Sequence, residues 1–128
     1  MYKVILVDEE EDVREGVVRE VDWHAYGFDL IGQAENGREA LEMVENAQPD
    51  IVVTDIRMPF MNGLQLAEAI RERFPMIKII IITGHDEFEY AQKAIKLQID
   101  EFVLKPFSSQ ELMQALLKMK GQIQAEEA

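Results

Sequence analysis

Cysteine is absent from this chain of 128 residues. Its absence excludes disulfides, thiolate metal sites and cysteine nucleophiles, and it agrees with a reducing compartment. Long apolar runs are also missing from the start, where "MYKVILV" gives way at once to the acids of "DEEED". This run is too short for a signal-peptide core or a membrane span. We therefore expect a soluble, cytoplasmic chain with no membrane partner.

Positive charge is scarce: 13 Lys and Arg stand against 25 Asp and Glu, which gives a net charge of -12. A surface of this sign repels a phosphate backbone, so we expect no direct nucleic-acid binding by this chain. The chain has the common size of one domain, and 48% of its residues are hydrophobic, enough for one core. We expect this domain over residues 1–123. Residues 124–128 lack apolar content, and we expect them to fray as the start of a linker to an output domain.

Apolar runs of strand length alternate with segments of helical period, which is typical of a parallel α/β sheet. The runs "IVVT" and "KIIIIT" are apolar on both faces, as in central strands that are covered by helices on each side. We predict a five-stranded, parallel, doubly wound sheet of flavodoxin-like order 2-1-3-4-5, with five helices. The expected strands are residues 3–7, 28–34, 51–54, 78–83 and 101–104.

Five groups of apolar residues at helical spacing predict the helices. Turn and cap signals agree, because Asn36-Gly37 and Asn62-Gly63 precede two of them and Ser108 with Glu111 forms a capping-box pattern. The groups are Val13, Val17 and Val21; Ala40, Val44 and Ala47; Ala67, Ile70 and Phe74; Phe88, Ala91 and Ile95; and Leu112, Leu116, Met119 and Ile123.

Charged and hydroxyl side chains fall where the expected strands end. Asp8 and Glu9 follow the first strand, Asp55 the third and Lys105 the fifth, and Thr83 ends the fourth. Each alone has an ordinary explanation as a helix-start acid, a turn or cap residue, or a surface lysine. A doubly wound sheet, however, binds ligands beyond the carboxyl ends of its strands, where the strand order reverses. Their common position therefore predicts a functional crevice.

The chemistry of this crevice points to phosphoryl transfer. Clustered carboxylates must take up protons or hold a cation between them. Oxygen ligands favour a hard cation, and Mg²⁺ commonly uses one or two carboxylates with waters and phosphate oxygens. Lys105 adds a second positive charge, and phosphoryl transfer needs charge neutralisation and positioning around the transferring group. Asp55 is a suitable nucleophile, because aspartate can form an aspartyl phosphate.

Four strings occur in order along the chain: "KVILVDEEEDVREG", "PDIVVTDIRMPFMNG", "IIIITGHDEFEYAQKAI" and "DEFVLKPF". With these strings the chain resembles a response-regulator receiver domain, the phospho-accepting module of two-component signalling, over essentially its whole length. The phrases "AENGREALE" and "FEYAQKAIKL" resemble further the receivers of AraC-type, YesN-like regulators. The resemblance implies that a sensor histidine kinase is the partner and that the chain controls an attached DNA-binding domain.

The resemblance also implies roles for the residues at the metal. Asp55 matches the phosphorylated aspartate, and Asp8 and Glu9 match the acidic pair that organises Mg²⁺. Arg57 matches the position whose backbone carbonyl completes the metal site. The pair in this chain is Asp-Glu, whereas Asp-Asp is commoner in the family.

Further roles implied by the resemblance concern the conformational switch that follows phosphorylation. Thr83 matches the hydroxyl that turns toward the phosphoryl group, and Lys105 matches the lysine that pairs with it. Phe102 matches the switch aromatic, which remodels the face of the fourth helix, fifth strand and fifth helix, and it lacks the hydroxyl of a tyrosine. Arg57 and His85 occupy positions that resemble those tuning dephosphorylation. A cis bond before the proline matched by Pro106 is also common in the family.

Three alternatives stay open from the residues. A receiver that binds proteins without phosphorylation is one. An aspartyl-phosphate hydrolase of the dehalogenase type is another, but it needs an acid two residues after Asp55, where this chain has Arg57. A flavodoxin-like FMN carrier needs a donor-rich phosphate loop where this chain has "DEEED". The sequence leaves open the kinase, its signal, the phosphoryl lifetime and whether the chain forms a phosphorylation-dependent homodimer.

Overall fold

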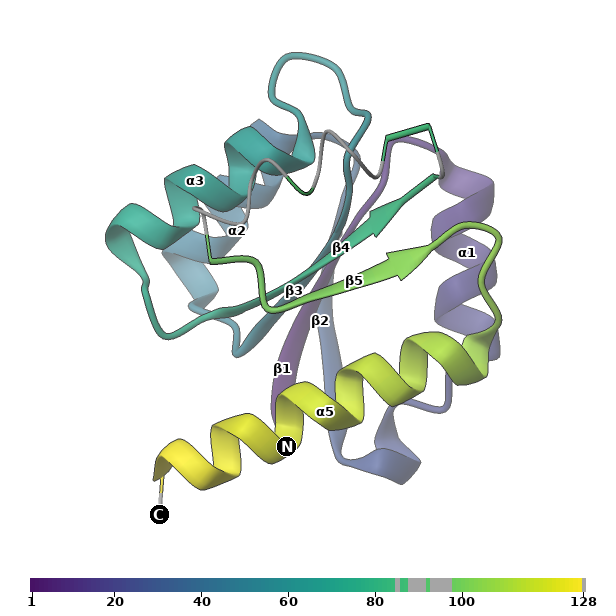
Figure 1. The fold of residues 1–128 in the computed structure, drawn as a ribbon, viewed down its shortest axis with the longest axis vertical. Helices are drawn as coiled ribbons and strands as arrows, with labels where there is room; N and C mark the ends of the chain where they lie inside the picture. Colours follow the sequence, from purple (N-terminus) through teal and green to yellow (C-terminus); the bar gives the residue numbers. More distant parts are fainter. Residues whose placement is uncertain (85, 88–91, 93–97, 128) are drawn as a thin grey trace.

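A computed structural model describes residues 1–84, 86–87, 92 and 98–127 of the chain. Its centre is a five-stranded parallel sheet of order β2-β1-β3-β4-β5, as predicted (Figure 1). In the described part of the chain, no helix is both long and apolar enough to cross a membrane. The strands are β1 (Tyr2–Val7), β2 (Phe28–Ala34), β3 (Ile51–Asp55), β4 (Lys78–Thr83) and β5 (Glu101–Leu104).

Helices cover both faces of the sheet (Figure 1). On one face, α1 and α5 enclose a core with the sheet, and on the other α2 and α3 enclose a second core. The expected fourth helix, with Phe88, Ala91 and Ile95, lies outside the described residues. The α-helices that the described residues form are α1 (Glu11–Glu20), α2 (Gly37–Ala47), α3 (Gly63–Arg73) and α5 (Ser109–Glu127), with a short 3-10 helix at His24–Tyr26.

The predicted helix caps are confirmed. The Asn36 side chain accepts a hydrogen bond from the Glu39 N–H at 2.8 Å, where α2 begins. Asn62 forms a complete capping box with Gln65 at the start of α3. Ser108 accepts from the Glu111 N–H at 3.1 Å before α5. Each cap satisfies backbone donors that a helix start leaves free, which fixes where the helices begin relative to the strand ends.

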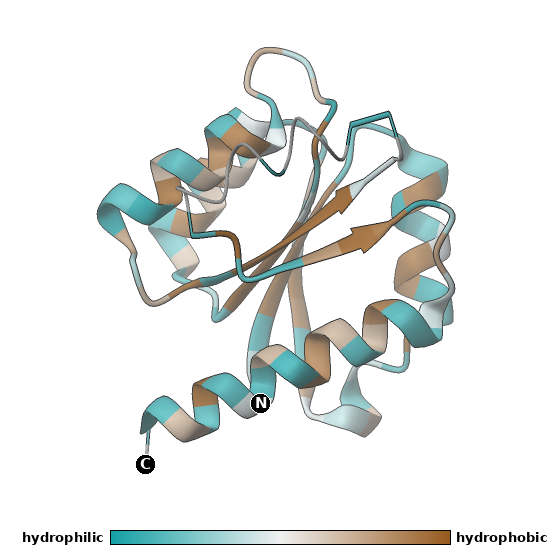
Figure 2. Ribbon diagram, in the orientation of Figure 1, coloured by the Kyte–Doolittle hydropathy of each residue, from teal (hydrophilic) through white to brown (hydrophobic). Residues whose placement is uncertain are grey.

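The central strands are buried along their whole length, as their apolar runs predicted. Every residue of β3 and β4 is buried, and the hydropathy colouring in Figure 2 shows apolar residues along the strands and on the sheet-facing sides of the helices. Burial on both faces makes the strands a rigid frame. The loops at the carboxyl edge therefore start from fixed points.

The C-terminal helix is longer than expected. It continues through Glu127, whereas a frayed segment was expected from residue 124. A reason is visible in its last turns, because Ile123 is buried and Glu126 accepts a hydrogen bond from Lys78 Nζ at 2.6 Å. Lys78 is itself 9% exposed, so this ion pair holds the helix end against the sheet.

Candidate functional site

The strand register brings the predicted site residues to one edge of the sheet. Val7 of β1 pairs with Thr54 of β3, so Asp8 and Asp55 follow directly on neighbouring strands. Thr83 of β4 pairs with Leu104 of β5, and Lys105 is the next residue. Because all these strands are parallel, their carboxyl ends lie together.

Asp55 is the last residue of β3 and is only 4% exposed. Its Oδ1 accepts the Ile56 N–H at 2.9 Å. The same oxygen lies 3.0 Å from the Lys105 Nζ. The aspartate is thus held by its neighbour's backbone and paired with an ammonium across two strands.

Asp8 lies beside this pair and lacks a full set of partners. Its Oδ1 accepts the Glu10 N–H at 2.9 Å, while Oδ2 is buried without a hydrogen-bond partner among the described residues. Burial raises the pKa of Asp8 from 3.8 to about 6; the Glu10 hydrogen bond opposes this rise and the charge of Asp55 adds to it. A buried carboxylate with a raised pKa and a free oxygen is suited to bind a cation.

Lys105 is the fixed cation of the site. Burial alone would lower its pKa, but the hydrogen bond and charge of Asp55 outweigh this effect, and the charges of Asp8 and Glu87 act in the same direction. The pKa of Lys105 is therefore raised above its ordinary value of 10.5, and the ammonium stays charged at neutral pH.

Thr83 is fully buried at the end of β4. Its Oγ1 donates to the Gly84 carbonyl at 3.2 Å. The backbone N–H of Lys105 donates to the Thr83 carbonyl at 2.8 Å. The threonine and the lysine are thus linked through the backbone at the same edge.

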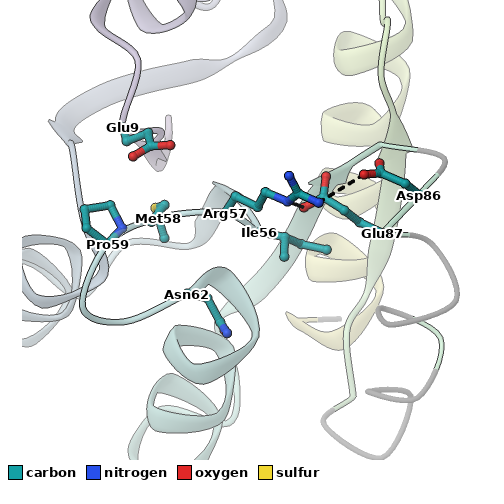
Figure 3. A pocket seen from close by; sticks show the side chains of 8 residues that line it. All are labelled: Glu9, Ile56, Arg57, Met58, Pro59, Asn62, Asp86 and Glu87. Carbon is teal, nitrogen blue, oxygen red and sulfur yellow. Dashed lines mark hydrogen bonds and ion pairs between the residues drawn. The ribbon is translucent and has the colours of Figure 1, made fainter.

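A groove of about 480 Å³ opens next to Ile56 and Arg57, the two residues that follow Asp55. Glu9 lies on one side of it, whereas the Arg57 side chain extends across toward Asp86 and Glu87 (Figure 3). Arg57 Nη2 lies 3.0 Å from Asp86 Oδ2, and Arg57 Nε lies 3.1 Å from Glu87 Oε2. The groove is lined by Glu9, Ile56, Arg57, Met58, Pro59, Asn62, Asp86 and Glu87.

The loop after β3 passes very close to Asp55. The Gly63 N–H donates to the Ile56 carbonyl at 2.8 Å. A Cβ on Gly63 would lie 2.2 Å from the Asp55 backbone oxygen. Only glycine allows this approach, which ties the start of α3 to the acceptor residue.

Comparison with known protein families identifies the family of this chain. A model of the response regulator receiver domain matches residues 4–117. The chain belongs to this family. The receiver domain is a module of two-component response regulators, generally a signalling switch rather than a classical enzyme.

Relatives of this receiver domain include transcription regulators. It is 35% identical over 127 residues to the transcriptional regulatory protein YesN of Bacillus subtilis, covering 99% of this chain and 34% of that protein. It is 37% identical over 112 residues to the transcriptional regulatory protein HptR of Staphylococcus aureus, covering 88% and 44%. The chain thus spans between a third and a half of the length of these relatives.

Solved structures show the same fold. The REC domain of AraT, a response regulator from Geobacillus stearothermophilus, has a TM-score of 0.93 and 39% identity, covering 99% of this chain and 98% of that one. The two-component transcriptional regulator AraC from Clostridium phytofermentans has a TM-score of 0.93 and 31% identity, covering 100% and 99%. The resemblance to AraC-type receivers is confirmed.

Receiver domains generally bind Mg²⁺ at the phosphorylation site. In the described part of this receiver domain, no three His, Cys, Asp or Glu side chains are gathered closely enough to hold a metal. Two carboxylates with waters are nevertheless a common Mg²⁺ ligand set. The unpartnered Oδ2 of Asp8 and the adjacent Asp55 fit this ion.

Two of the remaining predicted features of the receiver domain lie in or just after β5. Phe102 is half-buried on β5 and packs against the core under α2 and α3. The Lys105–Pro106 peptide bond is cis, as the resemblance implied. His85 lies outside the described residues.

Sequence reasoning missed the partners of Arg57. Asp86 and Glu87 stand in the string "GHDEFE", where they look like ordinary loop acids. The available signal was the opposite charge of Arg57 on the neighbouring loop, since the loops after β3 and β4 meet at the same edge. Sequence spacing alone does not predict which charged side chains of two different loops form ion pairs.

Proposed function

We propose that Asp55 receives a phosphoryl group from the phosphohistidine of a sensor histidine kinase. The observation that carries this proposal is the 3.0 Å ion pair between Lys105 Nζ and Asp55 Oδ1, next to the unpartnered oxygen of Asp8. Phosphoryl transfer to an aspartate requires a nucleophile, a fixed positive charge and a ligand for a cation. Asp55, the Lys105 ammonium and the unpartnered oxygen of Asp8 can serve as these three groups.

In the transfer step, a carboxylate oxygen of Asp55 attacks phosphorus. The phosphorus–nitrogen bond of the phosphohistidine breaks, and its electron pair returns to the kinase imidazole. Lys105 stays charged and pairs with the oxygens of the new acyl phosphate. Asp8 and Asp55 would hold Mg²⁺, with the backbone carbonyl of Arg57 and with Glu9 at the adjacent groove, and the bound ion would neutralise charge on the phosphoryl oxygens.

The response to phosphorylation runs through Thr83. Its hydroxyl exchanges the Gly84 carbonyl for a phosphoryl oxygen, and Phe102 on β5 moves with it. This shifts the population toward a different partner face that includes β5 and α5. Since relatives of this chain are transcriptional regulatory proteins, we infer that the face controls an attached DNA-binding domain.

Intact-mass spectrometry after treatment with acetyl phosphate and Mg²⁺ tests the proposal. We expect one added phosphoryl group on the unaltered chain and none on Asp55→Asn. Asp22→Asn, which changes an exposed aspartate away from the strand ends, serves as the matched control and is expected to be labelled normally. Equal labelling of Asp55→Asn, or no labelling of the unaltered chain, contradicts the proposal.

A further inference from the structure

Glu87 makes contacts that the phosphoryl-transfer step itself does not use. It is only 9% exposed, although it lies in the loop after β4. Its Oε1 accepts the Gly84 N–H at 3.1 Å, and its own backbone N–H donates to the Gly84 carbonyl at 3.1 Å. Glu87 therefore binds both the N–H and the carbonyl of Gly84, the residue that follows Thr83.

The Gly84 carbonyl is also the acceptor for the Thr83 hydroxyl, at 3.2 Å. A hydroxyl carries one proton and can donate one full hydrogen bond at a time. Donation to a phosphoryl oxygen on Asp55 therefore requires Thr83 to leave Gly84. A contact that holds Gly84 in place therefore stabilises the unphosphorylated arrangement, in which Thr83 donates to the Gly84 carbonyl.

Arg57, from the loop after β3, extends its side chain to Glu87 and anchors it (Figure 3). Its Nε lies 3.1 Å from Glu87 Oε2, a buried oxygen that has no hydrogen bond in the described part of the chain. The charge of this oxygen is thus balanced by an ion pair alone. Arg57 follows Asp55 by two residues, so a continuous chain of contacts joins the acceptor's loop to Thr83.

We propose that Glu87 is a positioning residue of the switch: anchored by Arg57, it holds Gly84 so that the Thr83 hydroxyl keeps donating its hydrogen bond to the Gly84 carbonyl. This inference rests on the proposed function, because it assigns a restraint to the same phosphorylation site. Loss of the Glu87 side chain removes the hydrogen bond from the Gly84 N–H and the ion pair with Arg57, and leaves only the backbone bond to the Gly84 carbonyl. Gly84 is then held less firmly, which makes it easier for the Thr83 hydroxyl to leave and shifts the population toward the phosphorylated arrangement.

The test measures the rate of phosphorylation by acetyl phosphate and Mg²⁺, followed by intact mass. Glu87→Ala is expected to raise the rate of phosphorylation about two- to five-fold. This is the effect of losing the partly exposed ion pair with Arg57 and the hydrogen bond from the Gly84 N–H. Glu87→Gln keeps an oxygen that can accept from Gly84 and gives a smaller increase. Asp86→Ala is the matched control, since it also removes an acid paired with Arg57 but has no hydrogen bond to Gly84.

A double-mutant cycle with Thr83→Ala separates positioning from general charge effects. The increase caused by Glu87→Ala is expected to disappear when the hydroxyl is absent. Equal rates for Glu87→Ala and Asp86→Ala, or an increase that persists without the hydroxyl, overturns the inference while leaving Asp55 as acceptor. Failure of the unaltered chain to be labelled instead removes the proposed function itself.

Discussion

Asp8 is a residue whose charge the fold does not balance internally. Its pKa is raised from 3.8 to about 6, so the folded chain holds the proton more tightly than the unfolded chain. Stability from this group is therefore fully present below about pH 4 and is lost as the pH rises through about 6. At neutral pH the buried charge of Asp8 therefore lowers the stability of the fold, and the proposed metal ion would offset this charge.

We predict that Asp8→Asn stabilises the metal-free chain at pH 7.5 by about 1–3 kcal/mol. The amide oxygen can still accept from Glu10, while the buried charge is gone. Urea denaturation with a chelator present measures this change. Added Mg²⁺ is expected to stabilise the unaltered chain and not the variant. An Asp8→Asn chain that is less stable than the original at this pH contradicts the account.

Gly63 is a residue where shape alone matters. A Cβ at this position meets the Asp55 backbone oxygen at 2.2 Å, so Gly63→Ala must displace the loop that carries the acceptor. We predict a loss of at least about 2 kcal/mol in the free energy of unfolding and slower labelling of Asp55.

Gly121→Ala is the matched control for this change. Gly121 lies inside α5, and a Cβ there meets nothing within 4 Å. Alanine has the higher helix propensity, so the control is expected to gain about 0.5–1 kcal/mol. Similar unfolding free energies for the two variants would show that the close approach is unimportant.

At the scale of elements, Arg71 joins α3 to the segment before β5. Its Nη1 donates to the carbonyls of Pro75 and Ile77 at 2.8 and 2.7 Å. Its Nη2 donates to the Gln98 carbonyl at 2.8 Å and to Asp100 Oδ2 at 2.9 Å. We predict that Arg71→Ala lowers the free energy of unfolding by about 2–4 kcal/mol. The change removes four hydrogen bonds, and it leaves the mostly buried carboxylate of Asp100 with only the Ile79 N–H at 2.7 Å and the more distant Lys78 ammonium.

Arg73 is the matched control on the same helix. Its side chain is mostly exposed and pairs with Glu45 at the surface. Surface pairs contribute less than about 1 kcal/mol, so Arg73→Ala is expected to change little. Thermal or urea denaturation compares the two arginines, and an equal loss would mean that burial of the Arg71 network is not what matters.

The elements also show how far the sequence determines the fold. The strand positions were predictable because "IVVT" and "KIIIIT" are β-branched and apolar on both faces, and only central strands are buried in this way. The meeting of Asp8, Asp55 and Lys105 followed from the rule for carboxyl edges of parallel strands. These predictions need only local pattern and topology.

Other features depend on loop geometry, which sequence pattern does not encode. The Arg57 pairs with Asp86 and Glu87 join two loops through long side chains. Phe60 adopts a left-handed backbone with φ of 70° and is 84% exposed, although an aromatic residue gives no signal for that conformation. The last turns of α5 depend on Lys78, far away in the sequence.

At the scale of the whole molecule, the net charge of -12 sets which partners it attracts. We predict that this chain alone does not bind duplex DNA at physiological salt, before or after phosphorylation, because added phosphoryl charge only increases the repulsion. Fluorescence anisotropy with a labelled duplex measures this. Binding with a Kd below about 1 μM, tighter than ordinary non-specific binding, contradicts the prediction.

The central claim is that the whole fold delivers one acceptor oxygen to the phosphoryl group, and that this oxygen belongs to Asp55. Borohydride reduction of the phosphorylated chain converts an acyl phosphate to an alcohol and so marks the residue that carried it. After trypsin cleavage, we predict homoserine at position 55 in the peptide of residues 39–57, and unaltered acids in the peptide of residues 4–14 that holds Asp8 and Glu9. Reduction at Asp8 or Glu9, with residue 55 still aspartate, would contradict the account.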